Sequence, residues 1–544
     1  MGRFKSAVAL ANKKLSLKLA ATVLASATLI SSLLGLFRDR LLNSMYYDTY
    51  KTGLDAYTVA FTVPDFMYFI LVSGALSVTF IPVLNQRLAS GNKQSAWELS
   101  ASLLNFMAIL TLIASVLIII FAEPLVHYVV GSGLDEASRA LATSMMRVVA
   151  VNPFLFAIAT IISSMQQAIG RFAFYAMAPA IYNIGIIIGA LFFTSGINIF
   201  GWQIFGGGIM GVALGVVLGS ILQLIVSSIG LIGMGFDYRF KIYTKNAGFR
   251  KVLRLLPARS LDQGLDYVRS IAEINIASHL QAGSVRAYQQ ASTLSNVPVN
   301  LIGVAISTAA FPKMTERIGQ GRPDLFEKEL QSIILLILWL ALPVSAIAFF
   351  GRGYLISFIK NGGDAIMSNL LGILAIAILF RSIYHISARS FYARQDTKTP
   401  LYISVFAVSF NILLALYLSM KANMGVYGLA WAASIAALLE VMILFVIMSR
   451  QIPGLFGRSF WRSALRMASA TGFMSIIAYF LVLAFPLTVD DKSFFTVFPK
   501  FALITTLSLS VYLLFSYMLK IKEAYPIIKK MEQILFPGIN KNDK

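Results

Sequence analysis

Residues 257–280 read PARSLDQGLDYVRSIAEINIASHL and are long enough to form a helix of several turns. The charged residues of this stretch recur at spacings of 3, 4, 3 and 4. At about 100° per residue, these spacings place them within roughly 80° of arc. Apolar side chains such as Leu265, Val268 and Ile271 occupy the opposite side. The pattern predicts a helix with a single charged face, made of Arg259, Asp262, Asp266, Arg269 and Glu273.

The composition of the whole chain decides where this helix belongs. Of the 544 residues, 58% are hydrophobic and 13% are charged, whereas soluble proteins are about 45–50% apolar and 25% charged. Ionisable side chains on a membrane-spanning helix are costly in lipid, so they face water or a bundle interior and mark a substrate or ion path. We therefore expect the charged face to line a central polar chamber. The alternatives are a helix lying at the membrane surface and a ladder of charges that only joins helices.

Long apolar runs recur along the chain, and a membrane span needs about 20 such residues. They predict an all-α polytopic membrane protein with about 14 transmembrane helices, of which the charged helix is the seventh. Basic residues gather in alternate loops, which by the positive-inside rule places both termini in the cytoplasm. The expected spans are residues 17–37, 54–84, 97–122, 138–165, 172–195, 205–234, 252–280, 287–312, 330–350, 364–388, 399–420, 425–449, 463–486 and 496–520.

The composition also argues against several functional classes. The net charge of +21 is explained by cytoplasmic loops, so no nucleic acid is expected as a partner. The chain has no cysteine, which excludes disulfides and thiolate metal sites, and its three histidines have no second ligand at metal spacing. We expect no metal site and no catalytic residues. A membrane glycosyltransferase would need a carboxylate in an ordered extracytoplasmic loop, where the short base-poor loops offer only Asp135, Glu136, Asp490 and Asp491.

The two halves of the chain resemble each other. GALSVTFIPVLNQRLASG from Gly74 aligns with GVAISTAAFPKMTERIGQG from Gly303, and Asn183 aligns with Asn411 at nearly the same offset. Six spans separate equivalent points, so both copies have the same orientation, as in parallel-repeat transporters that bind substrate near the midplane. We predict a six-helix lobe in residues 1–235, a second in residues 236–450, and two extra helices with a basic cytoplasmic tail in residues 451–544.

Three motifs near the N-terminus are FRDRLL from Phe37, LDAYTVAFTVPDF from Leu54 and GALSVTFIPVL from Gly74. They resemble the MurJ/MviN family of lipid II flippases, in the multidrug/oligosaccharidyl-lipid/polysaccharide exporter superfamily. Further similarity, from Gln166 and Ser390 among other places, extends the resemblance over nearly the whole chain. It implies two six-helix lobes around a cationic cavity, export of a lipid-linked peptidoglycan precursor by alternating access, and no catalysis.

The same resemblance assigns Arg38, Asp39 and Asp55 to substrate binding, because they match the family's Arg-Asp pair and the acid that opens its second span. A pyrophosphate needs cationic donors, and guanidinium groups bind its oxygens bidentately. Arg38 alone provides few cationic donors for such a ligand. Three further family arginines are replaced here, by Ser32, Tyr68 and Thr293.

Other cations are therefore candidates for the missing arginines. Arg269 is the best of them because it lies deeper in its span than Arg259 and has an acid one turn away on each side. The alternative for Arg269 is a permanent ion pair with Glu273. Arg147 and Arg286 are expected to snorkel near an interface instead of reaching the cavity.

Ion coupling is a further hypothesis, with Asp262 or Asp266 meeting Asn411 of the eleventh span. Carboxylate and amide oxygens suit a hard cation such as sodium. Protons and the membrane potential are alternative driving forces, and no cofactor is expected. The competing interpretation of Asn411 is a hydrogen bond that packs helices together.

Together these features predict a multi-pass flippase of the bacterial cytoplasmic membrane that moves lipid II for cell-wall biogenesis and cell shape. Its partners are the undecaprenyl-linked precursor and the lipid bilayer, with cell-wall synthesis enzymes as further candidates. An exporter of another lipid-linked oligosaccharide or of an amphipathic cation is the alternative, because the motifs outside the cavity would look the same. A non-transporting scaffold is disfavoured, since unused charge within a membrane span has only costs.

Overall fold

The structure is a computed structural model that describes residues 17–73, 79–199, 202–205, 207–488, 490–526 and 528–530. Part of the repeat motif that begins at Gly74, and residues 531–544 of the predicted basic tail, lie outside the described residues. By its internal contacts the chain divides into two compact units, one ending at Arg286 and the other beginning at Ala287.

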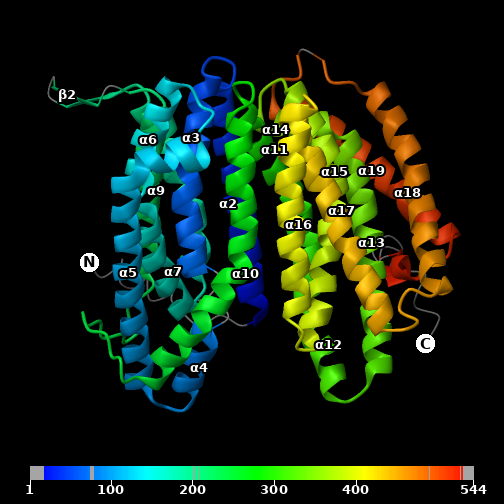
Figure 1. Ribbon diagram of the computed structural model, residues 1–544, viewed down its shortest axis with the longest axis horizontal. Coiled ribbons are helices and arrows are strands. Elements are labelled where there is room, and N and C mark those ends of the chain that lie inside the picture. The colour runs from blue at the N-terminus through cyan, green and yellow to red at the C-terminus, as the bar shows by residue number, and fades with distance from the viewer. Residues whose placement is uncertain are drawn as a thin grey trace. The chain divides into compact units, whose positions relative to one another are not determined.

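The first unit is a bundle of roughly parallel helices, drawn from blue to green in Figure 1. Several helices continue into a short π-helical segment, η1 and η3 to η6, whereas η7 is a short 3-10 helix. A short antiparallel hairpin pairs β1 (Ile197–Ile199) with β2 (Trp202–Phe205). The helical elements are α2 (Leu17–Tyr46), α3 (Lys51–Tyr68), η1 (Phe69–Ser73), α4 (Ile81–Ala89), α5 (Lys93–Pro124), η3 (Leu125–Val130), α6 (Glu136–Val149), α7 (Asn152–Ala168), α8 (Ala173–Ile188), η4 (Gly189–Phe193), α9 (Met210–Ile229) and α10 (Ala247–Ser278).

The second unit is also helical in its described residues and has its own apolar core. In that core Tyr512 of α19 donates a hydrogen bond to the Trp339 carbonyl oxygen of α13 over 2.7 Å. The Trp339 indole donates in turn to Ser516 over 3.2 Å. Its elements, counting α11 from its start in the first unit, are α11 (Ser284–Pro298), η5 (Val299–Val304), α12 (Ala305–Gly319), α13 (Pro323–Phe350), α14 (Arg352–Ile359), α15 (Ala365–Ala393), α16 (Lys398–Leu416), η6 (Tyr417–Lys421), α17 (Val426–Gln451), α18 (Arg458–Ala484), α19 (Phe494–Met518) and η7 (Lys522–Ala524).

The predicted fold class is confirmed. Among the described residues, 13 helical segments are long and apolar enough to cross a membrane. The predicted seventh span, α10, is not among them because its charged residues lower its hydropathy. With 32 residues it is nevertheless about 48 Å long, more than a bilayer core requires. Counting α10, the described chain supplies the 14 helices that the sequence predicts.

The first helix differs from its predicted extent. α2 continues to Tyr46 instead of ending near residue 37, so Arg38 and Asp39 lie inside the helix and not after it. The predicted span ended at residue 37 because charged residues follow it and charges are costly within a span. The helix continues because both charged side chains have partners inside the protein, described below.

The division into units also differs from the predicted boundary after residue 235. α10 packs against α3, α4, α5, η1 and η3, all of which belong to the first unit. Apolar residues at its start, such as Val252, join the core formed by Val72, Leu99 and Ile161. The helices α18 and α19 pack on α13 in the second unit, so residues after 450 do not separate from that unit. The lobes defined by the sequence repeat stay a prediction.

Glycines bring α8 and the adjoining η4 into backbone contact with α9. A methyl group added at Gly185 would lie 2.2 Å from the Cα atom of Gly219, and one added at Gly189 would lie 2.3 Å from the Cα atom of Gly215. Small residues of this kind let helices in membranes approach closely. α8 also packs against α2, so this packing helps to set the distance between Asn183 of α8 and the charged part of α2.

We expect Gly185→Val to disrupt the bundle, because overpacking a tight contact costs about 1–3 kcal/mol or more. The measurement is the thermal unfolding midpoint and the yield of monodisperse protein in detergent. Gly472→Val is the matched control, since Gly472 lies within α18 and has no atom near its added methyl position within 4 Å. Equal losses in the two variants would contradict the role of the α8–α9 contact.

Candidate functional site

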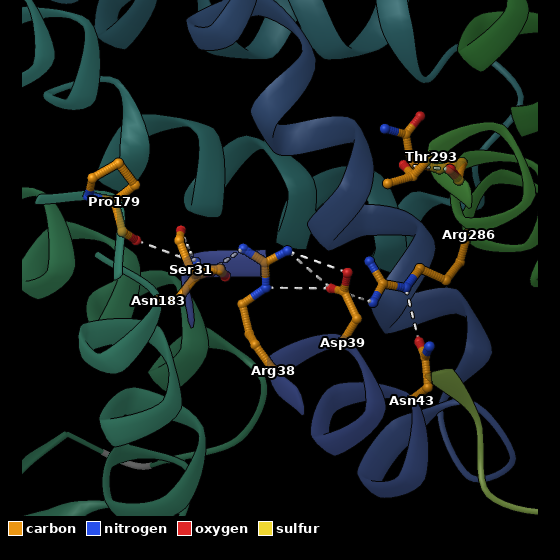
Figure 2. A network of polar contacts seen from close by, with 9 residues as sticks. Ser31, Arg38, Asp39, Asn43, Pro179, Asn183, Arg286 and Thr293 are labelled. Carbon is orange, nitrogen blue, oxygen red and sulfur yellow. Dashed lines mark hydrogen bonds and ion pairs between the residues drawn. The ribbon is translucent and has the colours of Figure 1, made fainter. Parts of the chain in front are cut away.

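Polar side chains of α2 form the centre of a network inside the first unit (Figure 2). Asp39 and Asn43 are four residues apart on α2, so they share one face of the helix. Arg38 is displaced by about 100° and points toward α8. The helix therefore presents a carboxylate and an amide to one neighbour and a guanidinium group to another.

Arg38 is held by two partners. Its Nη1 donates to Oδ1 of Asn183 over 2.9 Å, and its Nε and Nη2 donate to the Asp39 carboxylate over 3.2–3.3 Å. The Asn183 amide nitrogen donates to the carbonyl oxygens of Ser31 and Pro179, each over 3.2 Å. Because its nitrogen is engaged in this way, Asn183 keeps its oxygen turned toward Arg38. The Arg38 side chain is 24% exposed.

Arg286 reaches the same carboxylate from the start of α11. Its Nη2 lies 3.4 Å from Oδ1 of Asp39, and its Nε donates to Oδ1 of Asn43 over 2.9 Å. The residue is only 4% exposed. The prediction that Arg286 snorkels at an interface is therefore wrong. Its partners on α2 lie more than 240 residues away in the sequence, so no local sequence pattern around Arg286 predicts them.

Asp55 also contacts the start of α11. Its Oδ1 accepts the backbone N–H of Arg286 over 2.8 Å, and its Oδ2 accepts that of Gly283 over 2.6 Å. Backbone N–H groups at a helix N-terminus lack partners within the helix and favour a negative charge. Buried Asp55 thus caps α11 from another helix, and its predicted part in substrate binding stays a prediction.

Asp65 of α3 is a further acid near the network that the sequence analysis did not select. It lies close enough to Arg38 for the two charges to interact. The signal that could have found it is an acidic residue inside an otherwise apolar span, immediately after Pro64.

On the charged face of α10, the structure describes the side chains of Asp266, Arg269 and Glu273, which lie in the second half of the helix. Arg269 places Nη2 3.4 Å from Oδ1 of Asp266 and Nε 4.0 Å from Oε1 of Glu273. The Asp266 side chain is 77% exposed, whereas those of Arg269 and Glu273 are 20% and 8% exposed. These pairs suit both interpretations of Arg269, head-group binding and a permanent ion pair. The side chains of Arg259 and Asp262 lie outside the described residues.

The positions of the replaced arginines carry other contacts. The Tyr68 hydroxyl lies 2.8 Å from Oγ1 of Thr160, and the neighbouring Phe69 stacks on Tyr267 of α10 with ring centroids 4.6 Å apart. Tyr68 thus links α3 to α7, and Phe69 packs η1 against α10, where the resemblance implied a cation. Thr293 donates its hydroxyl to the Gln289 carbonyl oxygen within α11, and Ser32 is exposed on α2.

The predicted ion-coupling residues are divided between the two units. Asp266 belongs to the first unit, and Asn411 is buried in α16 of the second. No group of three or more His, Cys, Asp or Glu residues is placed to hold a metal ion in the described part of the chain. Coupling through Asp262, Asp266 and Asn411 stays a prediction.

Two of the loop carboxylates that an enzyme could have used have structural partners. Hydrogen bonds from Ser138 lower the pKa of Asp135, which caps the start of α6. Asp491 accepts hydrogen bonds from Lys500 over 2.7 Å and from Thr488, and these contacts lower its pKa. A general acid needs a pKa near the working pH, so neither residue is suited to that role.

The chain is similar to known proteins over most of its length. Residues 50–498 match the family described as Lipid II flippase MurJ. A "Probable lipid II flippase MurJ" of Bdellovibrio bacteriovorus is 26% identical over 479 residues, covering 85% of this chain and 88% of that protein. The "Lipid II flippase MurJ" of Burkholderia cenocepacia is 25% identical over 438 residues, covering 77% and 81%.

Solved structures show the same fold. A lipid II flippase MurJ in an inward closed conformation superposes with a TM-score of 0.70 at 24% identity, covering 91% of this chain and 98% of that one. An inward-facing multidrug resistance transporter of the MATE family gives a TM-score of 0.65 at 15% identity, covering 80% and 98%.

We expect Asp55→Ala to destabilise the protein by about 1–3 kcal/mol, because two buried backbone N–H groups lose their acceptor. Asp55→Asn should cost less, since one amide oxygen can still accept. Thermal unfolding in detergent measures the loss, and hydrogen exchange at residues 283–286 locates it. Asp490→Ala, at an exposed loop carboxylate, is the control, and a loss no larger than in that variant would contradict the capping role.

Two single variants and one double variant separate the two interpretations of Arg269. If Arg269 binds the head group, we expect Arg269→Ala to abolish transport and Arg269→Ala with Glu273→Ala to leave it abolished. If the pair is only structural, each single change costs about 3–5 kcal/mol, whereas the double change is nearly neutral. Protein level and transport are measured in all three. Recovery of both in the double variant would exclude head-group binding by Arg269.

Proposed function

Because the chain belongs to the MurJ family of lipid II flippases, we propose that it moves lipid II across the bacterial cytoplasmic membrane by alternating access. Lipid II is the undecaprenyl-linked peptidoglycan precursor, whose hydrophilic head group is joined to the lipid through a pyrophosphate. The tail stays in the bilayer, while the head group requires a polar path through the protein. The apolar helices and the charged α10 suit a transporter of this kind.

The observation that supports this proposal most directly is the position of Arg38. It is a cation within a membrane-spanning helix, partly exposed and oriented by Asn183 and Asp39. A charge in such a place is costly, so it marks a functional site. Guanidinium forks bind phosphate oxygens bidentately, so the acceptors that now hold Arg38 are groups that a phosphate can replace. In this proposal Asn183 and Asp39 keep the fork oriented while no substrate is bound.

The orientation and the driving force are parts of the proposal. Basic residues in alternate loops support cytoplasmic placement of both termini. An anionic head group leaving a negative cytoplasm gains about 2.3 kcal/mol per elementary charge per 100 mV, so the membrane potential favours export. Coupling to sodium or protons through Asp262, Asp266 and Asn411 is the alternative. Cell-wall synthesis enzymes are proposed partners because they consume the exported precursor.

Other substrates in the same fold fit less well. An amphipathic cation would meet two guanidinium groups, those of Arg38 and Arg286, which share the Asp39 carboxylate. Another lipid-linked oligosaccharide with a pyrophosphate linkage would meet the same cations. The proposal therefore depends on the pyrophosphate for binding and on the family for the identity of the head group.

The test is to deplete the protein in its native cell, or to express it in a strain that lacks its own flippase. The measurement is the fraction of lipid II that an impermeant head-group-cleaving enzyme reaches from outside. We expect depletion to lower this fraction and expression to restore it. An unchanged fraction with normal wall synthesis would contradict the proposed function.

We expect Arg38→Ala to reduce transport at least about tenfold, because a charge-assisted hydrogen bond is worth about 1.5–3 kcal/mol. Arg38→Lys should keep part of the activity, since it retains the charge and loses the fork. The accessible fraction of lipid II is measured at matched protein levels. Arg147→Ala is the control because Arg147 is exposed on α6. Normal transport by Arg38→Ala would remove Arg38 from the substrate site.

A further inference from the structure

Arg38 and Arg286 converge on one anionic position. Figure 2 shows Asp39 between the two guanidinium groups. Nη2 of Arg38 lies 3.2 Å from both carboxylate oxygens, and Nη2 of Arg286 lies 3.4 Å from Oδ1. Two cations that start on different helices, α2 and α11, thus meet at a single carboxylate.

Each cation is oriented by a partner of its own. Asn183 accepts a hydrogen bond from Nη1 of Arg38, and Asn43 accepts one from Nε of Arg286. Asp55 fixes the backbone from which Arg286 projects, through the N–H groups of Gly283 and Arg286. Groups preoriented in this way can bind an anion without first being ordered.

We propose that Arg286 is the second head-group-binding cation and that it selects a diphosphate over a monophosphate. In this proposal Asp39 occupies the anion position in the empty protein, and the substrate displaces it. One phosphate group then binds to Arg38 and the next to Arg286. The proposal rests on the proposed function, because it assumes that the transported lipid carries a pyrophosphate.

A purely structural role for Arg286 makes a different prediction. Asp39 already has a bidentate partner in Arg38, so a second guanidinium group is not required to neutralise it. If Arg286 only stabilised the fold, its loss would lower stability without changing the ratio of affinities for two ligands that differ by one phosphate. That ratio is therefore the informative quantity.

The experiment measures binding of undecaprenyl pyrophosphate and undecaprenyl monophosphate to the purified full-length protein in detergent. We expect the wild type to prefer the diphosphate by about tenfold or more, since the second contact is charge-assisted. Arg286→Gln should remove most of that preference and leave monophosphate binding nearly unchanged. Arg38→Gln should weaken the binding of both ligands. Arg147→Gln, on the exposed face of α6, is the matched control and should behave as wild type.

Arg286→Lys is included in case Arg286→Gln fails to fold, because lysine keeps the positive charge. Arg286→Lys should show an intermediate preference for the diphosphate. A diphosphate preference in folded Arg286→Gln or Arg286→Lys equal to that of the wild type would overturn the inference. The accessibility of lipid II in cells that express the wild type is measured in parallel with these binding experiments. If the wild type exports lipid II but Arg286→Gln keeps its preference, only the inference fails. If the wild type exports none, the proposed function fails.

Discussion

The cost of placing charge inside a membrane-spanning bundle governs the arrangement of this protein. Arg38, Asp39 and Arg286 lie within or at the start of spanning helices, and each has a charged or amide partner. Without those partners the charges would be expensive in a low-dielectric interior. Because the partners are present, α2 continues as one helix through its Arg-Asp pair and delivers both side chains to the interior of the first unit.

The packing around the network holds the partners of these charged side chains in place. The glycine contacts between α8 and α9 let α8 lie where Asn183 reaches Arg38. Asp55 holds the start of α11 so that Arg286 faces Asn43 and Asp39. In the place of a family arginine, Tyr68 links α3 to α7, and the neighbouring Phe69 packs η1 on α10. In the described network, the guanidinium groups of Arg38 and Arg286 meet at Asp39.

The sequence predicted what depends on local patterns. Apolar runs located the spans, and the 3–4 spacing of charges on α10 anticipated the ion pairs of Arg269. The sequence could not show which residues distant along the chain meet in the fold. Arg286 looked like an interfacial arginine because it lies at the start of its span, and its partners on α2 are distant in the sequence. In the sequence, Asn183 stood out only because it aligns with Asn411 in the internal repeat, although it is the amide that orients Arg38.

The central claim is that Arg38 and Arg286 together hold the pyrophosphate of the transported lipid. The most direct measurement is an experimental structure of the full chain with lipid II bound. We expect pyrophosphate oxygens within hydrogen-bonding distance, about 2.7–3.2 Å, of both guanidinium groups, with Asp39 displaced from them. A bound head group elsewhere, with the contacts of Asp39 to Arg38 and Arg286 intact, would contradict it.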